Sequence, residues 1–375
     1  MSFLSIALVR QRYVADGGAE RFVARLLDAV HGSDARVTLI TRQWAPTAGV
    51  DVSTVNPFSL GRTWRDRSFA RAVCRLLAHR RFDLVQSHER VACCDIYRAG
   101  DGVHREWLAQ RARALGPLGR LSLALNPYHR YTLRAERRLF ESARLRAVIC
   151  NSKMVRAEIQ KYFRVPEDRL HVIYNGIDTN DFHPNLRRHR AEVRARYRIP
   201  DDATLFLFVG SGFERKGLAA ALSALAGVPG AHLLVVGREK RLARFRAQAR
   251  ALGIQGRVHF AGVQPDVRPY YGAADAFILP TLYDPFPNVV LEAMASGLPV
   301  VTSTKCGAAE LIRDGANGYV VDALDTTALR QSMTRLQASE LRVSMGAAAR
   351  QTVETLDFPR MAKELLTLYR ACLAK

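Results

Sequence analysis

Short apolar runs alternate with amphipathic stretches along most of the chain. The first run, at residues 3–9, is almost continuously apolar, which is typical of a parallel strand that is buried on both faces. Further runs of this kind lie at residues 36–41, 50–55, 84–87 and 147–151. Stretches with helical periodicity separate them, so the first half of the chain is predicted to form a doubly wound α/β sheet.

The alternation resumes after residues 183–200, a polar, arginine-rich stretch bounded by Pro184 and Pro200, which we interpret as a linker. Strands are expected at residues 204–209, 231–236, 258–261, 274–279 and 300–303, and helices at about 239–252, 266–272, 289–296, 326–339, 341–355 and 357–374. These elements predict a second Rossmann-like sheet. A chain of 375 residues suits two domains, which we place at residues 1–182 and 201–356, followed by a last segment at 357–375.

Three local signals refine the expected element ends. Ser152 follows a strand and has a side chain that is favoured at a helix N-cap. Gly297 and Pro299 are expected to end the helix at 289–296, as a C-terminal Gly and a following Pro usually do. Residues 175–178 read NGID, which predicts a turn whose glycine, Gly176, supplies an unusual backbone angle.

Composition bears on the compartment of the protein. No apolar run approaches the ~20 residues that a membrane-spanning helix requires, and residues 1–9 are too short for a signal peptide. The six cysteines show no metal-ligand spacing, and the adjacent Cys93 and Cys94 are a poor disulfide pair. We therefore expect a reducing cytoplasm.

The charge of the chain indicates an anionic partner. The formal net charge is +21 and the pI is about 10.4, so nucleic acid, acidic lipid headgroups and a phosphorylated glycan are all candidates. Arginine-rich usage in a high-GC genome is the alternative explanation for part of this charge.

Much of the basic charge lies in residues 103–146, which contain ten arginines and three glutamates, a net of +7. Trp, Tyr and Leu residues are interleaved with the arginines, a composition that suits an amphipathic segment at an anionic membrane surface. A solvated helix with an ordinary buried face and a nucleic-acid patch are the alternatives. Nucleic acid is the least favoured, because no known binding module accompanies the charge.

Candidate chemistry is concentrated in the βαβ unit at residues 276–310. Asp284 and Glu292 stand eight residues apart, between one predicted strand and the next. Both acids can reach the same edge of a parallel sheet, where open α/β sheets bind ligands. Solvated acids, or acids that only complement a helix N-terminus, are the alternative.

Residues 284–300 read DPFPNVVLEAMASGLPV. This stretch resembles the pattern E-x-F-x-x-V-x-L-E-A-M-A-x-G-x-P-V of the retaining, nucleotide-sugar-dependent glycosyltransferases of family 4 (glycosyl transferases group 1), which include the lipopolysaccharide core glucosyltransferases and sucrose synthase. The one departure is Asp284 in place of the first Glu. The resemblance implies a GT-B fold, with two Rossmann-like domains facing a central cleft and a C-terminal helix that crosses back to the first domain. It also implies a reaction that retains anomeric configuration and needs no metal.

A second candidate site follows the strand at 204–209. Small residues beginning with Gly210 lead to Arg215 and Lys216 at the start of a helix, an arrangement suited to phosphate. The resemblance assigns this segment to the donor diphosphate, Glu292 to the ribose, and Val263 to the neighbourhood of the base. The predicted donor-binding residues are Gly17, Gly18, Gly210, Arg215, Lys216, Val263, Asp284, Phe286, Asn288, Val289 and Glu292.

The first half contributes further candidates. Gly17 and Gly18 follow the first strand and open a helix, where backbone N–H groups can bind an anion; a purely structural turn is the alternative. His88 ends a strand and could equally be a satisfied structural residue, but the resemblance implies contact with the transferred sugar. Asp101 lies in CDIYRAGDGVHREWL, which resembles the reaction-centre segment of the core glucosyltransferases. The predicted catalytic residues are His88, Asp101, Arg215, Lys216 and Asp284, and the predicted acceptor-binding residues are Asp16, Glu20 and Asp101.

Together these features predict a monomeric, peripheral enzyme on the cytoplasmic face of a bacterial inner membrane. It would transfer a hexose, glucose from UDP-glucose, to a lipopolysaccharide core or another lipid-linked glycan, with no cofactor and no nucleic-acid partner. An acceptor from capsule, exopolysaccharide or O-antigen synthesis is the alternative within this class. A basic nucleic-acid-binding protein is the alternative from another class. An NAD-dependent dehydrogenase is disfavoured because no G-x-G-x-x-G follows a strand with an acid ~20 residues on.

Overall fold

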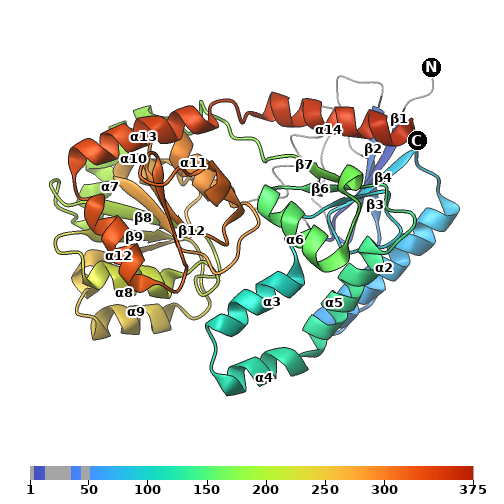
Figure 1. Ribbon diagram of the computed structural model, residues 1–375, viewed down its shortest axis with the longest axis horizontal. Coiled ribbons are helices and arrows are strands. Elements are labelled where there is room, and N and C mark those ends of the chain that lie inside the picture. Colours follow the sequence, from blue (N-terminus) through green and yellow to red (C-terminus); the bar gives the residue numbers. More distant parts are fainter. Residues whose placement is uncertain (1–3, 13–34, 44–50, 375) are drawn as a thin grey trace. The chain divides into compact units, whose positions relative to one another are not determined.

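The computed structural model describes residues 4–12, 35–43 and 51–374. It divides into two compact units (Figure 1), the first formed by residues 1–176 and 358–375 and the second by residues 177–357.

The first unit is built on a parallel sheet with the strand order β3-β2-β1-β4-β5-β6-β7. The strands are β1 (Leu4–Val9), β2 (Ala35–Thr41), β3 (Asp51–Thr54), β4 (Leu84–Ser87), β5 (Ile96–Arg98), β6 (Ala147–Cys150) and β7 (Leu170–Val172). The helices are α2 (Gly61–His79), α3 (His104–Arg113), α4 (Pro117–Leu125), α5 (Pro127–Phe140), α6 (Lys153–Phe163), the short η1 (Glu167–Arg169) and α14 (Phe358–Leu373). Ser152 caps α6 as predicted, its hydroxyl accepting the Val155 N–H at 3.2 Å.

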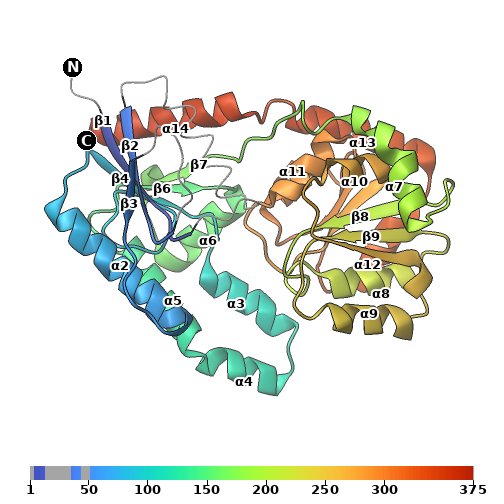
Figure 2. The same cartoon turned by 180° about the vertical axis from the view of Figure 1, so that it is seen from behind.

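Both faces of this sheet are apolar because β1 alternates between two cores. Ala7 and Val9 pack in the cluster that contains residues of α2, α5 and α6, whereas Ile6 and Leu8 pack in the cluster that contains α14. The last helix therefore contacts the first unit, as predicted, and it lies along that sheet in both views of the molecule (Figures 1 and 2).

Gly176 has a different role from the expected one. Its φ is not positive, so the turn does not require a left-handed residue here. A Cβ on Gly176 would instead lie 2.9 Å from the backbone nitrogen of Phe358, the first residue of α14. The glycine is needed for the close approach of α14, a tertiary contact that the local sequence does not reveal.

The second unit contains a parallel sheet with the order β10-β9-β8-β11-β12-β13. The strands are β8 (Leu205–Val209), β9 (His232–Val236), β10 (Val258–Gly262), β11 (Ala276–Leu279), β12 (Val300–Ser303) and β13 (Gly318–Val321). The helices are η2 (Pro184–His189), α7 (Arg190–Tyr197), α8 (Leu218–Ala226), α9 (Leu242–Ala251), η3 (Gln255–Arg257), α10 (Arg268–Ala273), α11 (Asn288–Ala295), η4 (Gly307–Leu311), α12 (Thr326–Arg335) and α13 (Ser339–Val353). Gly297 follows α11 with a φ of 75°, as its predicted place at the helix end requires.

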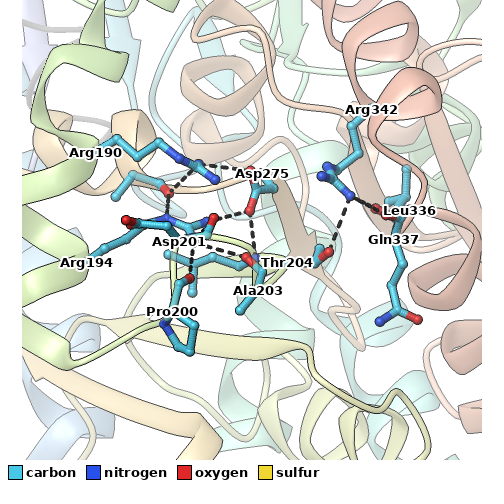
Figure 3. Close-up of polar contacts among 12 residues, drawn as sticks. Arg190, Arg194, Pro200, Asp201, Ala203, Thr204, Asp275, Leu336, Gln337 and Arg342 are labelled. Atoms are coloured by element: carbon cyan, nitrogen blue, oxygen red, sulfur yellow. Dashed lines mark hydrogen bonds and ion pairs between the residues drawn. The ribbon is translucent and has the colours of Figure 1, made fainter.

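Residues 183–200, which we interpreted as a linker, form η2 and α7 and belong to the second unit. Arg194 of α7 is fully buried and donates to Asp275 Oδ2 at 2.6 Å and to the carbonyls of Ala273, Pro200, Asp201 and Ala203 (Figure 3). Arg190 donates to the other Asp275 oxygen at 2.9 Å. Arginines that suggest a solvated linker in the sequence thus join α7 to the N-terminal end of β11, since Asp275 immediately precedes that strand.

Cys93 and Cys94 are not bonded to each other, as expected, but the structure contains a disulfide that the expected reducing environment does not favour. Cys74 of α2 forms a disulfide with Cys93, with the two Cα atoms 5.8 Å apart. Cys94, Cys150, Cys306 and Cys372 are free and buried. The partner of Cys93 lies 19 residues away in sequence, so it becomes apparent only when α2 packs beside the loop after β4.

Candidate active site

The loop between β8 and α8 brings two cations to the carboxyl edge of the second sheet. Gly217, the N-cap of α8, has a φ of 81°, and a Cβ there would lie 1.9 Å from the Pro280 carbonyl oxygen. Only glycine fits this position, so the end of β11 packs directly against the start of α8. Arg215 and Lys216 immediately precede this contact, and the aliphatic stem of Lys216 lies against Gly210.

Asp284 holds both cations with one carboxylate oxygen. Its Oδ2 accepts from Arg215 Nη1 at 2.9 Å and from Lys216 Nζ at 2.5 Å. Arg215 Nη1 also donates to the Tyr283 carbonyl at 3.0 Å, and the Arg215 carbonyl accepts the Thr281 hydroxyl at 3.0 Å. The segment after β11 is thereby joined to the loop after β8 through both side chains and backbone.

Burial is the largest influence on Asp284 and by itself would raise its pKa. The charges of Lys216 and Arg215 outweigh burial and lower the pKa below its ordinary value. Lys216 and Asp284 are only 8% and 6% exposed, whereas the Arg215 side chain is 38% exposed. The result is an ionised carboxylate between a buried ammonium and a more accessible guanidinium, a group of charges suited to binding an anionic phosphate.

The backbone fixes Asp284 just before α11. Its N–H donates to the Lys305 carbonyl at 2.9 Å, and its carbonyl accepts the Gly307 N–H at 2.8 Å. Phe286 is buried, and Asn288 and Val289 form the half-buried first turn of α11. The N-terminal end of a helix favours negative charge, so the first turn of α11 adds to the positive potential near Asp284.

Glu292 lies one turn further along α11 and is 1% exposed. The Tyr271 hydroxyl donates to Glu292 Oε2 at 2.9 Å and also contacts the Val289 carbonyl at 3.3 Å. The sequence analysis missed Tyr271, because a tyrosine in an apolar helix reads as ordinary core and its partner is 21 residues away.

The structure brings together part of the predicted donor site. Gly210, Arg215, Lys216 and Asp284 are linked by the contacts above, and Phe286, Asn288, Val289 and Glu292 follow Asp284 into and along α11. Val263 lies after β10, two strands away from β8, and is 54% exposed. No contact described above joins Val263 to the cation pair. Asp16, Gly17, Gly18 and Glu20 lie outside the described residues.

The first unit places His88 directly after β4. Its backbone N–H donates to the Val9 carbonyl at 3.0 Å, and its Nε2 lies 3.0 Å from Gln86 Nε2. Burial, together with the charges of Arg98 and Arg10, holds the pKa of His88 well below its ordinary value. The ring is therefore neutral at physiological pH.

Next to His88 lies a charged network that the sequence analysis did not identify. Arg90 Nε donates to Glu136 Oε1 at 3.0 Å, and Arg90 Nη1 lies 3.7 Å from Asp101 Oδ2. The same Glu136 oxygen accepts the His104 N–H at 2.8 Å. Asp101 is the exposed end of this network, with its side chain 62% exposed. Glu89 directly precedes Arg90 in the sequence, and burial raises the pKa of its carboxyl to about 7. The candidate acceptor contact at Asp101 thus lies beside a half-buried arginine.

Comparison with known proteins agrees with this geometry. Residues 16–181 match the family model described as Glycosyltransferase Family 4, and residues 189–352 match the model described as Glycosyl transferases group 1. Two parallel Rossmann-like sheets with the last helix returning to the first unit define the GT-B fold. The chain belongs to the family 4, group 1, glycosyltransferases, which are retaining hexosyltransferases.

Three similar proteins illustrate the relationship. The chain is 28% identical to the lipopolysaccharide glucosyltransferase WaaG of Escherichia coli (strain K12) over 376 residues, covering 96% of this chain and 98% of that protein. A crystal structure of WaaG, a glycosyltransferase involved in lipopolysaccharide biosynthesis, has a TM-score of 0.83 at 26% identity and covers 97% of this chain and 99% of that chain. A 153-residue match to the lipopolysaccharide core biosynthesis glycosyltransferase LpsE of Rhizobium meliloti (strain 1021) is 34% identical and covers 40% of this chain and 45% of that protein. Sucrose-phosphate synthase from Thermosynechococcus elongatus shares the fold, with a TM-score of 0.79 at 22% identity over 99% of both chains.

Proposed function

We propose that this enzyme transfers glucose from UDP-glucose, with retention at the anomeric carbon, to the core of lipopolysaccharide or to another lipid-linked glycan. The observation that carries the proposal is the pairing of Arg215 and Lys216 on the single carboxylate of Asp284. The choice of glucose and of a lipopolysaccharide acceptor is supported by the similarity to WaaG along nearly the whole chain.

In this proposal the donor diphosphate takes over contacts that Asp284 makes in the free enzyme. The acceptor oxygen bonds to the anomeric carbon, the bond from that carbon to the diphosphate breaks, and the acceptor proton passes to the departing phosphate. Negative charge grows on the diphosphate as the bond breaks, and Arg215 and Lys216 stabilise that charge. Asp284 and Asn288 would then orient sugar hydroxyls, and Glu292 would accept from the ribose.

Saturation-transfer NMR with UDP-, GDP-, ADP- and CMP-sugars tests the donor assignment. We expect selective binding of UDP-glucose that is lost in Arg215→Ala/Lys216→Ala and in Glu292→Ala. Arg250→Ala is the matched control, because Arg250 is an exposed cation near the end of α9. Binding of bare DNA with strong salt dependence, and of no nucleotide sugar, would contradict the proposal and favour the nucleic-acid alternative.

We further propose that the enzyme works at the cytoplasmic face of the inner membrane, bound there through one end of the first unit. Leu118, Leu121 and Leu125 are 83%, 56% and 61% exposed, and their spacing places them on one face of α4. Arg120 and Arg130 are exposed nearby. An apolar helix face flanked by arginines suits an interface with anionic lipid headgroups.

The start of α2 extends this apolar surface. Phe58, Leu60 and Trp64 are 73%, 67% and 47% exposed, and the rings of Phe58 and Trp64 contact each other edge to face. The Arg62 guanidinium lies 5.0 Å from the centre of the Tyr128 ring on α5. The start of α2 therefore lies beside the start of α5, next to the end of α4, as Figures 1 and 2 show. We call the six exposed residues Phe58, Leu60, Trp64, Leu118, Leu121 and Leu125 the apolar tip.

Within the part of the chain that the structure describes, no helix is long and apolar enough to cross a membrane. Co-sedimentation with vesicles containing phosphatidylglycerol tests surface binding, with phosphatidylcholine vesicles as the uncharged reference. We expect binding to the anionic vesicles that weakens in Leu118→Ser/Leu121→Ser/Leu125→Ser and in Phe58→Ser/Trp64→Ser. The control Val343→Ser changes an apolar side chain of the second unit that is 67% exposed. Equal binding by all variants would refute a role for the apolar tip.

A further inference from the structure

A chain of buried hydrogen bonds joins the C-terminal helix to His88. The hydroxyl of Tyr369, on α14, donates to Gln86 Oε1 at 2.7 Å, and Gln86 Nε2 lies 3.0 Å from His88 Nε2. Tyr369 is 1% exposed, Gln86 is fully buried and His88 is 5% exposed. Tyr369 and Gln86 stand 283 residues apart in sequence.

The donor and acceptor roles in this chain follow from the chemistry of each group. A carbonyl oxygen can only accept, so the Tyr369 hydroxyl must donate to Gln86 Oε1. The amide nitrogen of Gln86 can only donate, so His88 Nε2 must accept and carries no hydrogen. A neutral imidazole has one protonated nitrogen, which places the proton of His88 on Nδ1. Burial raises the pKa of Tyr369, so its hydroxyl stays protonated and remains a donor.

We propose that Tyr369 and Gln86 are positioning residues that hold His88 in its neutral, Nδ1-protonated form, so that the ring offers an N–H donor from Nδ1. The consequence for catalysis rests on the proposed function and on the contact between His88 and the transferred sugar that the family resemblance implies. The tautomer itself is a property of the free enzyme and does not depend on that function.

Contacts along α14 and at both of its ends fix the position of the Tyr369 side chain. Leu365 and Met361 are buried in the same core as Tyr369. Arg146 Nη1 donates to the Cys372 carbonyl at 2.9 Å, which ties the end of α14 to the start of β6. The close approach of Phe358 to Gly176 fixes its beginning. A helix held at both ends and along one face keeps the Tyr369 hydroxyl within hydrogen-bond distance of Gln86 Oε1, and its donation there favours the observed orientation of the amide.

Loss of the Tyr369 hydroxyl should release this constraint. With no donor on its oxygen, the Gln86 amide can turn so that Oε1 faces His88, which then favours a proton on Nε2. We expect Tyr369→Phe to show a mixture of the two tautomers. Tyr162→Phe is the matched control: it also removes a tyrosine hydroxyl bond in the first unit, to Glu106 Oε2 at 2.7 Å, without touching Gln86 or His88.

Long-range ¹H–¹⁵N correlation of the histidine rings in the full chain, labelled with ¹⁵N-histidine, tests the proposal. The His88 signal is assigned by its absence in His88→Gln. We expect Nδ1–H in the wild type and in Tyr162→Phe, and a shift toward Nε2–H in Tyr369→Phe. An Nε2–H ring in the wild type would overturn the proposal, and an unchanged ring in Tyr369→Phe would overturn the role of Tyr369.

Donor binding gives a second readout. If His88 Nδ1–H donates a hydrogen bond to the donor sugar, Tyr369→Phe should weaken UDP-glucose binding about fivefold, as loss of one good hydrogen bond does. The same variant should leave the binding of UDP, which lacks the sugar, unchanged. Equal weakening of both ligands would point to a merely structural effect and count against the proposal. Failure of the wild type to bind any nucleotide sugar would contradict the proposed function instead, and the tautomer measurement would still decide the inference.

Discussion

Asp284→Ala should destabilise the second unit when no donor is bound. The substitution removes the carboxylate that pairs with both Lys216 and Arg215. Removing one partner of a buried ion pair costs about 3–5 kcal/mol, because a charge is left buried and uncompensated. Lys216 is 8% exposed and carries most of this cost, whereas the Arg215 side chain, at 38% exposed, can be solvated. We therefore take the lower end, about 3 kcal/mol.

For a unit of this size about 1 kcal/mol shifts the melting temperature by roughly 2–4 °C, so we expect a fall of roughly 6–12 °C in calorimetry. UDP should then raise the melting temperature of Asp284→Ala more than that of the wild type. In the wild type the diphosphate must compete with Asp284 for the two cations, whereas in the variant it supplies the missing negative charge.

Asp266→Ala is the control, because Asp266 pairs with Arg268 on the exposed surface of the same unit and such pairs contribute at most about 1 kcal/mol. An Asp284→Ala protein as stable as Asp266→Ala would refute the reasoning. An equal gain from UDP in the wild type and in Asp284→Ala would refute the competition between carboxylate and diphosphate.

Three further predictions concern stability. Arg194→Met should cost the second unit about 3 kcal/mol, the lower end for a broken buried ion pair, because Asp275 loses Arg194 but keeps Arg190. Urea unfolding followed by circular dichroism measures this cost, and a cost below about 1 kcal/mol would show that the pair is dispensable. Burial raises the pKa of Glu89 to about 7 in the folded protein, above its value in the unfolded chain. The protonated carboxyl therefore contributes its full stabilisation below the unfolded pKa, and this stabilisation is lost as the pH rises through the folded pKa. The wild type should therefore lose stability relative to Glu89→Gln between pH about 4.5 and 7, and parallel melting curves for the two proteins across that range would contradict this. Cys74→Ser should lower the melting temperature of the first unit, because the disulfide closes a loop of 19 residues and such bonds contribute about 3 kcal/mol. A count of four free thiols in the denatured, unreduced wild type would verify the bond, and a count of six would disprove it.

Local patterns were enough to predict most strands of both sheets and most helices of the second unit, but they gave no strand at β5 or β13 and no bounds for α2, α3, α4 or α5. The apolar run of β1, the N-cap Ser152 and the helix end at Gly297 each depend on neighbours in sequence, and the structure has each in its predicted place. The resemblance over residues 284–300 likewise pointed to Asp284 and Glu292 as a pair on one βαβ unit.

Tertiary contacts decide what the sequence could not predict. Gly176 is required by α14, 182 residues away at Phe358, and α7 is attached to the second sheet by Asp275. The pairings Cys74–Cys93 and Tyr369–Gln86 likewise depend on which helix packs against β4 and the loop after it. Side chains such as Tyr271 carry no local sign of their partners, so their place in the site follows only from the fold.

The central claim is that Arg215 and Lys216 grip the diphosphate of the donor. Calorimetric titration of UDP-glucose into the wild type, Arg215→Ala/Lys216→Ala and the control Arg250→Ala tests it most directly. Loss of two charge-assisted contacts should weaken binding by at least about 100-fold in the double variant, with the control unchanged. Wild-type affinity in the double variant would contradict the claim and place the donor phosphates elsewhere.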